Sequence, residues 1–290
     1  CAPGKLRMSL TIVSAGMVLI YPLIYEAMIG LEGMRLILYW VVLQPAQKEG
    51  LKRRLRNLIA QAWPFLAALA GVVAWRLFIF QGGRSNTDAG GLLRQYLNDP
   101  LGMAVKVLVE TGRDFVETVV LAWGVPANKL AAKAGALEII IPLGLAVLLG
   151  LGLWMFTRRV SSFETNPQSG KPSTAAWAGV LGVVVTLLPV ILTDRSVDYS
   201  YSMDRFTLQS SAAAALLLSA ALFSGGRRWV RWSGLGMLIV LAMVTHYNNA
   251  VYYRDHWRNQ KQVWFQLTAR APQIKADTLL MVLLPVGYRQ

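Results

Sequence analysis

The chain has 290 residues, of which 55% are hydrophobic and only 15% are charged. Water-soluble domains average nearer a quarter charged residues, so the composition excludes an ordinary soluble protein. The net charge of +14 comes without a nucleic-acid recognition motif, and most basic residues flank apolar runs, which argues against nucleic-acid binding. The single cysteine, Cys1, excludes an internal disulfide framework and a cysteine metal cluster.

The first residue is not Met, so we expect the sequence to be part of a longer chain. The alternative is a processed N-terminus with a lipidated Cys1, although one lipid adds little holding power beside several spans.

Uncharged apolar runs recur along the chain, each close to the ~20 residues with which a helix crosses ~30 Å of hydrocarbon. Lipid cannot satisfy free backbone N–H and C=O groups, and the runs lack the period-two alternation of barrel strands, so they must be helices. We therefore predict an all-α polytopic membrane helix bundle. The runs are 8–25, 57–75, 139–157, 172–193, 206–226 and 232–253.

Three basic loops fix the predicted topology, because Lys and Arg concentrate on the cytoplasmic side of membrane helices. The loops are 45–57, 158–171 and 225–231. To keep all three inside, a segment at 28–44 must also cross, which gives about seven spans in the cytoplasmic membrane. That segment contains Glu32 and Arg35, whose i, i+3 spacing allows them to pair and so lowers the cost of entering lipid.

A long outer region, 81–138, contains an amphipathic segment at 100–123. Its five charged residues fall on one helical face, so we expect the helix to lie in the outer interface rather than cross; an eighth span is the alternative. Asp99 can cap its first turn with Pro100 at the first helical position, and Gly124 can end it. The charged face comprises Lys106, Glu110, Arg113, Asp114 and Glu117.

The bundle is predicted to occupy residues 1–253, with 254–290 as a C-terminal segment on the outer side. The stretch 254–270 can continue the last helix as far as Pro272, and 278–286 is an apolar run too short to cross a membrane. A helix followed by a short buried strand is typical of the beginning of a small outer-face domain.

The sequence carries no motif for a known catalytic or metal site. It lacks a phosphate-binding glycine loop, a His-x-x-x-His pair and a Gly-x-Ser-x-Gly elbow. His246 and His256 would lie about 15 Å apart on one straight helix, too far to share a metal ion. No cofactor, metal or catalytic residue is therefore indicated.

The most polar outer loop, 194–205, lies between two predicted spans. Arginine at a membrane surface can bind a lipid phosphate bidentately, and a carboxylate there can hold a cation or act as a base. Arg76 lies at the outer end of its own span, so we predict that Arg76, Arg195 and Arg205 line one site for an anionic lipid carrier. The alternatives are a solvated loop and a snorkelling arginine. The remaining polar residues of the loop include Asp194, Asp198, Tyr199 and Asp204.

Several short phrases together resemble the later spans of bacterial type C glycosyltransferases, which take sugars from polyprenyl-phosphate carriers on the outer face. The phrases are Tyr25-Glu26, Gly30-Leu31-Glu32-Gly33-Met34-Arg35, Trp63-Pro64-Phe65, Trp75-Arg76-Leu77-Phe78-Ile79-Phe80, Asp204-Arg205-Phe206, Gln266-Leu267 and Arg270-Ala271-Pro272. In that family the catalytic carboxylate lies in the first outer loop, and no position here matches it. The resemblance implies that this chain is the carrier-binding and structural half of such an enzyme, with the catalytic loop outside it.

Two other functions remain open. The chain could be a non-catalytic accessory subunit of a larger membrane complex, photosynthetic or respiratory, whose helices pack against other subunits. A transporter is less favoured, because transporters place charged or broken-helix sites at mid-membrane, whereas the only helix-breaking positions inside the uncharged runs are proline and small residues. The expected partners are membrane lipids, a polyprenyl-phosphate carrier and other membrane subunits; the sequence does not identify a substrate or a donor.

Overall fold

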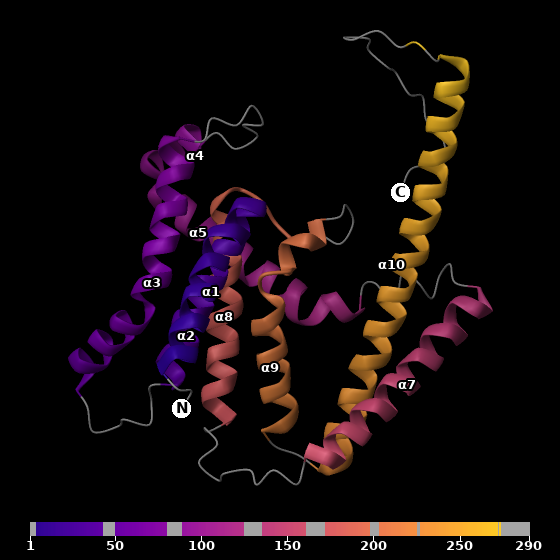
Figure 1. Ribbon diagram of the computed structural model, residues 1–290, viewed down its shortest axis with the longest axis horizontal. Helices are drawn as coiled ribbons and strands as arrows, with labels where there is room; N and C mark the ends of the chain where they lie inside the picture. The colour runs from indigo at the N-terminus through magenta and orange to yellow at the C-terminus, as the bar shows by residue number, and fades with distance from the viewer. Residues whose placement is uncertain are drawn as a thin grey trace.

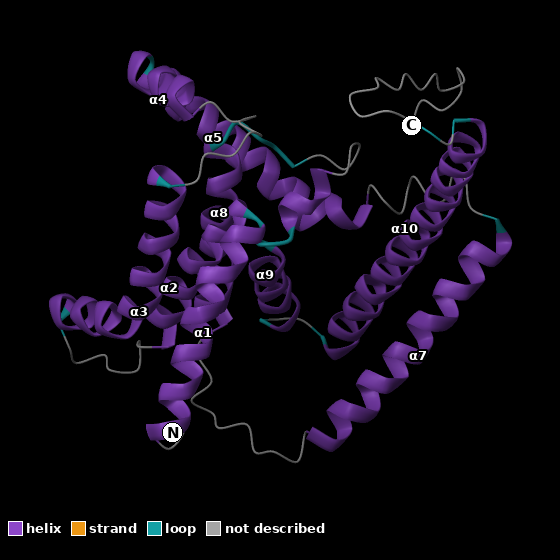
Figure 2. Ribbon diagram, turned by 45° about the horizontal axis from the view of Figure 1, so that its top comes forward, coloured by secondary structure: helices purple, strands orange, loops and turns teal. Residues whose placement is uncertain are grey.

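The computed structural model describes residues 4–42, 50–79, 89–124, 135–160, 172–197, 203–224, 227–271 and 273. Within these ranges every regular element is a helix, which confirms the predicted all-α class (Figure 2). Four stretches are long and apolar enough to cross a membrane, as expected of a membrane protein. They are Leu51–Trp75, Ala136–Phe156, Ser173–Leu192 and Trp229–Arg270.

Each of the seven predicted spans corresponds to a helix, although two of them are short. α2 and α9 have 13 residues each, or about 20 Å of helix, which is less than the hydrocarbon thickness. α9 begins later than the predicted run because residues 203–207 form a separate 3₁₀ turn, η3. The helices are α1 (Gly4–Ile24), α2 (Gly30–Val42), α3 (Leu51–Phe78), α7 (Ala136–Val160), α8 (Pro172–Leu192), α9 (Ser211–Phe223) and α10 (Arg228–Arg270).

The helix directions place the basic flanks together. In Figure 1 the first turns of α1, α3, α8 and α10 lie toward the bottom, and so do the last turns of α2, α7 and α9. The basic residues near these ends are therefore gathered on one side of the molecule, and the polar loop that follows α8 is on the other. Those with described side chains include Lys52, Arg53, Arg56, Arg158, Arg227 and Arg231.

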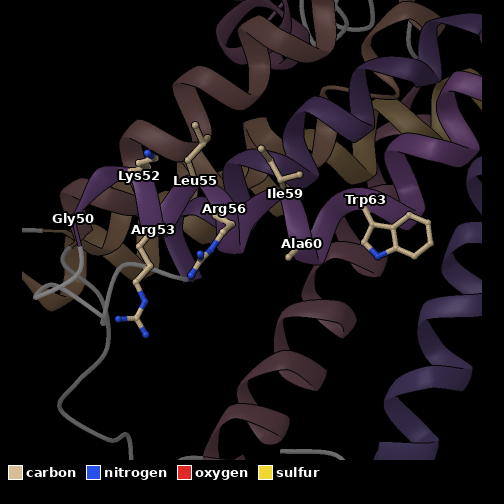
Figure 3. A pocket seen from close by; sticks show the side chains of 8 residues that line it. All are labelled: Gly50, Lys52, Arg53, Leu55, Arg56, Ile59, Ala60 and Trp63. Atoms are coloured by element: carbon tan, nitrogen blue, oxygen red, sulfur yellow. The ribbon is translucent and has the colours of Figure 1, made fainter.

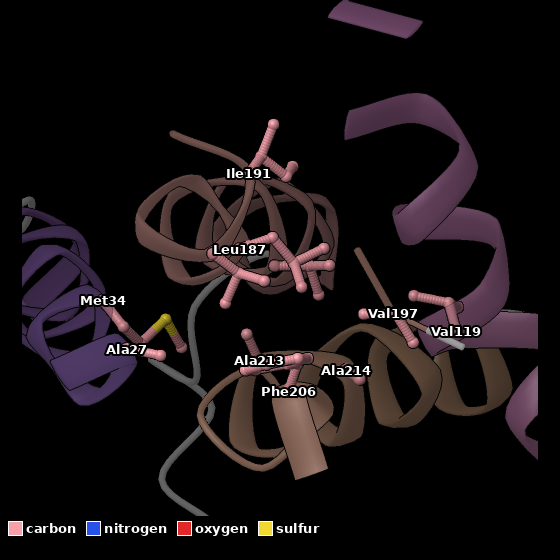
Figure 4. Packing of buried hydrophobic residues seen from close by; sticks show 11 residues of the cluster. Ala27, Met34, Val119, Leu187, Ile191, Val197, Phe206, Ala213 and Ala214 are labelled. Atoms are coloured by element: carbon pink, nitrogen blue, oxygen red, sulfur yellow. The ribbon is translucent and has the colours of Figure 1, made fainter. Parts of the chain in front are cut away.

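α8 is the central helix of the bundle. It packs against α2 on one side and α9 on the other, and its apolar residues Val183, Leu187 and Ile191 are buried (Figure 4). Close approach is possible because glycines lie at the contacts: a Cβ atom at Gly179 would come within 2.7 Å of the Leu217 backbone. Small residues at helix contacts are typical of membrane bundles, where tight packing replaces the hydrophobic driving force.

α7 and α10 form a second pair beside this core. They pack against each other, and α10 also contacts α9, so both views show them side by side and apart from α1, α2 and α3 (Figures 1 and 2). Their surfaces carry many exposed apolar side chains, such as Leu148, Phe156 and Met237. Helices that expose apolar residues all round are suited to contact with lipid.

A partly buried polar network joins the first three helices. The Tyr21 hydroxyl on α1 donates a hydrogen bond to Glu32 on α2, and Arg35 pairs with the same carboxylate at 3.0 Å. The Arg35 guanidinium also lies 4.0 Å from the ring centroid of Phe65 on α3. The sequence prediction that Glu32 and Arg35 pair is therefore confirmed.

The region between α3 and α7 contains the predicted amphipathic helix and one helix that was not predicted. α4 (Ala89–Asn98) precedes α5 (Pro100–Val116), which continues as a π-helical turn, η2 (Glu117–Leu121). Asp99 caps α5 by accepting a hydrogen bond from the Gly102 N–H, with Pro100 in the first turn as predicted. In both views α5 and η2 run across the end of the bundle rather than parallel to α8 (Figures 1 and 2).

Candidate functional site

The site is built on the turn that ends α8. The Asp194 N–H donates to the Ile191 carbonyl and the Arg195 N–H to the Val190 carbonyl, which is the hydrogen-bond pattern of a Schellman cap. Asp194 adopts a positive φ of 57°, where glycine is usual but aspartate is tolerated. The cap ends the helix at a defined point and so fixes the direction of Arg195.

The polar face of α5 holds the same turn from the side. The Lys106 ammonium lies 2.6 Å from an Asp194 carboxylate oxygen, and the fully buried Asp114 carboxylate accepts a hydrogen bond from the Val197 N–H at 3.2 Å. The apolar face of α5 points outward, with Leu101 80% and Leu108 73% exposed. The charged face therefore contacts the bundle through Lys106 and Asp114, and the apolar side chains of the first turns are left exposed, whereas Phe115 and Val119 near the end of the helix pack into the core.

Arg195 and Arg205 converge on one aromatic ring. Their guanidinium carbons lie 5.9 Å and 5.4 Å from the ring centroid of Phe206, within the range of cation–π attraction. Tyr25, in the turn between α1 and η1 (Glu26–Ile29), stacks on the same ring at 6.0 Å. Two parts of the chain that are far apart in the sequence, the turn at Tyr25 and the stretch with Arg195, Arg205 and Phe206, thus meet at the end of the bundle opposite the basic flanks, and we call these four residues the outer cluster.

The outer cluster contains a buried polar atom that lacks a partner. Within the part of the chain that the structure describes, the Tyr25 hydroxyl is buried and makes no hydrogen bond. Burial raises the pKa of this hydroxyl, and the positive charges of Arg205 and Arg195 act in the opposite direction. The hydroxyl therefore stays protonated near neutral pH and can donate a hydrogen bond to a ligand.

Gln209 adds a second unsatisfied group in the turn after η3. Its side chain is 1% exposed, and neither amide atom has a hydrogen-bond partner among the described residues. A buried amide without partners costs free energy unless a water or a ligand satisfies it. Gln209 lies three residues after Phe206, so a second unsatisfied polar group is present in the segment that carries Arg205.

This arrangement can bind an anion but offers no metal site. Two guanidiniums and a phenol supply donors for phosphate oxygens, while the described residues include no group of His, Cys, Asp or Glu side chains that could hold a metal ion. Lys106 pairs with Asp194, so that this carboxylate does not oppose an anion. The chemistry supported is recognition of a phosphate group.

The structure brings together two of the three predicted arginines. Arg195 and Arg205 meet at Phe206, whereas Arg76 lies in the last turn of α3, which packs against α1 and α2. The side chains of Arg76 and Asp204 lie outside the described residues, as do Asp198 and Tyr199 entirely. Their part in the site stays a prediction.

Three residues of this region were not anticipated from the sequence. Tyr25 ends the first predicted span on the outer side, so topology could have placed it at the correct depth. Phe206 was counted as the start of a span, and Gln209 lies within the same run without any polar pattern to mark it. Their grouping arises from how the helices pack, which a single sequence does not encode in a recognisable motif.

Comparisons with protein-family models, with curated proteins and with solved structures find no match to this chain.

Proposed function

We propose that this chain is the carrier-binding and structural part of a membrane protein that acts on lipid-linked sugars at the outer face of the cytoplasmic membrane. The observation that carries the proposal is the convergence of Arg195 and Arg205 on Phe206, beside the unpartnered hydroxyl of Tyr25. A polyprenyl phosphate offers the matching chemistry, because its phosphate needs charged donors and its chain needs lipid. Catalysis would need a carboxylate outside this chain.

The proposal includes a topology of seven spans with the outer cluster on the outer side. The basic residues at the ends of α3, α7 and α10 support a cytoplasmic position for that side of the bundle. Helices as short as α2 and α9 would cross with the help of the adjacent turns η1 and η3, and of local thinning of the bilayer.

The test is carrier binding to the purified protein in detergent, followed by native mass spectrometry. We expect a short-chain polyprenyl phosphate to bind, the uncharged polyprenol to bind much more weakly, and Arg205→Gln to weaken phosphate binding about tenfold through the loss of a charge-assisted hydrogen bond. Arg94→Gln, which removes an exposed positive charge on α4, is the matched control. Equal losses in both variants, or no binding to the wild-type protein, would contradict the proposal.

A second candidate function is that of an accessory subunit in a larger membrane assembly. It is favoured by the outer half of α10, which extends beyond the other helices in Figure 1 and exposes Tyr253, Trp257, Trp264 and Phe265. Exposed aromatic residues of this kind are enriched at protein interfaces. Purification in a mild detergent distinguishes the two functions, because a subunit would leave the membrane in a stoichiometric complex.

A further inference from the structure

The basic run at the start of α3 is divided between two faces of the helix. The Arg54 guanidinium donates to the Trp40 carbonyl at 2.8 Å and stacks on the Trp40 ring at 3.7 Å, so this residue joins α3 to α2. Lys52, Arg53 and Arg56 are exposed on the other face. Arg54 therefore has a structural role, and the other three cations are presented away from the bundle.

These three cations line one end of a groove of about 890 Å³ along α3. Figure 3 shows Lys52, Leu55 and Ile59 in one row and Arg53, Arg56 and Ala60 in the other, with Trp63 at the far end. The groove is cationic in its first turns and wholly apolar beyond Arg56. Such a gradient along one helix face matches a ligand with an anionic head and a hydrocarbon tail.

The position of the groove narrows the choice of ligand. It begins on the side of the bundle where the basic flanks gather (Figure 1), and Ile59 and Trp63, 52% and 61% exposed, continue it into the span. The apolar part, from Arg56 to Trp63, runs about 10 Å along the helix, which is shorter than the ~15 Å of hydrocarbon in one leaflet and suits part of one acyl chain. A free phosphate or a nucleic acid would leave the apolar half of the groove unused.

We propose that this groove binds an anionic glycerophospholipid of the cytoplasmic leaflet. Lys52, Arg53 and Arg56 contact the phosphate, and an acyl chain lies along Leu55, Ile59 and Ala60 toward the Trp63 ring. This site is on the opposite side of the membrane from the outer cluster and does not depend on it. Its occupant is a lipid of the surrounding bilayer that steadies the start of α3.

The experiment measures binding of phosphatidylglycerol and phosphatidylcholine to the full chain in detergent by native mass spectrometry. A basic residue near an anionic lipid surface contributes roughly fivefold to binding, so the triple variant Lys52→Gln, Arg53→Gln, Arg56→Gln is expected to lose at least tenfold in phosphatidylglycerol binding. The single variant Arg56→Gln is expected to lose about fivefold. Neither variant should alter the weak binding of phosphatidylcholine.

The matched control removes three charges from the same side of the protein through Arg158→Gln, Arg227→Gln and Arg231→Gln. Phosphatidylglycerol binding to this control should fall less than twofold. A loss as large as that of the triple variant in the groove would show that bulk charge rather than the groove attracts the lipid. Trp63→Ala should weaken phosphatidylglycerol without affecting sn-glycerol 3-phosphate, which has the head chemistry but no chain. Equally tight binding of sn-glycerol 3-phosphate and phosphatidylglycerol would overturn the lipid assignment.

Discussion

Asp114 illustrates how single residues hold the outer cluster in place. Its carboxylate is fully buried, accepts the Val197 N–H and lies 3.2 Å from the Arg113 guanidinium. Burial raises the pKa of this carboxyl, while the Val197 hydrogen bond and the Arg113 charge act to lower it. The backbone hydrogen bond, rather than the charge of the carboxylate, therefore accounts for the role of Asp114 in the fold.

We predict that Asp114→Asn keeps the fold at neutral pH and that Asp114→Ala destabilises it by about 1–3 kcal/mol. Asparagine can still accept the Val197 N–H, whereas alanine leaves that group buried and unpaired. Because the pKa of Asp114 is raised in the folded state, its protonation stabilises the fold most at pH below 3.8, and this contribution is lost as pH rises through the folded pKa.

Thermal unfolding in detergent at pH 4.5 and pH 7.5 measures both effects. The unfolding temperature of Asp114→Asn minus that of the wild type should be larger at pH 7.5 than at pH 4.5. A stability difference that is independent of pH would show that the carboxyl does not titrate with unfolding in this range.

Residue-level predictions succeeded where the partners are neighbours in the sequence. The Glu32–Arg35 pair and the Asp99 cap depend on spacing within one helix, which the sequence displays directly. The outer cluster depends on lateral positions: Arg195 and Arg205 were expected at the same depth, but only the packing of η1 and η3 against α8 brings Tyr25 to them. The depth of a residue in a membrane can be predicted from hydropathy, whereas the residues of other helices that it contacts cannot be predicted in this way.

At the scale of elements, α5 shows both the strength and the limit of the sequence pattern. Its start at Pro100 and its amphipathic sequence agree with the prediction, whereas its position in the membrane interface stays a prediction. The pattern did not reveal that the charged face would pack inward on the turn after α8, because a helical wheel gives two faces but not their neighbours. The π-helical turn η2 was also not predicted, since its sequence resembles that of an ordinary helix.

The contact between α8 and α9 gives a prediction for a single glycine. Replacing Gly179 with alanine places a Cβ atom 2.7 Å from backbone atoms of Leu217, so the helices must separate, and we expect a loss of about 1–3 kcal/mol in stability. Gly150→Ala on α7 is the control, because no atom outside its own helix segment lies within 4 Å of its Cβ position. That control should be neutral or slightly stabilising through helix propensity. Similar unfolding temperatures for the two variants would show that α8 and α9 are not in close contact.

At the scale of the whole molecule, the chain is far from the compactness of a soluble protein. Its accessible surface is 21545 Å², whereas a folded soluble monomer of 32.0 kDa has about 12,000 Å². Exposed large apolar side chains are numerous on α3, α7 and α10. In water such a surface would cause aggregation, so the architecture requires lipid or a partner protein around most of its circumference.

The orientation of the whole molecule is tested by two single-cysteine variants, made after Cys1→Ser removes the native thiol. Ser169→Cys falls in the basic loop between α7 and α8, and Ser202→Cys in the polar loop between α8 and η3. α8 is long and apolar enough to cross, and basic loops are retained in the cytoplasm. A membrane-impermeant maleimide applied to intact cells should therefore label position 202, and position 169 should react only after permeabilisation. Labelling of both positions in intact cells would mean that α8 does not cross, and labelling of position 169 alone would invert the topology. In either case the outer cluster could not meet a carrier at the outer face, whereas lipid binding along α3 would be judged separately by its own variants.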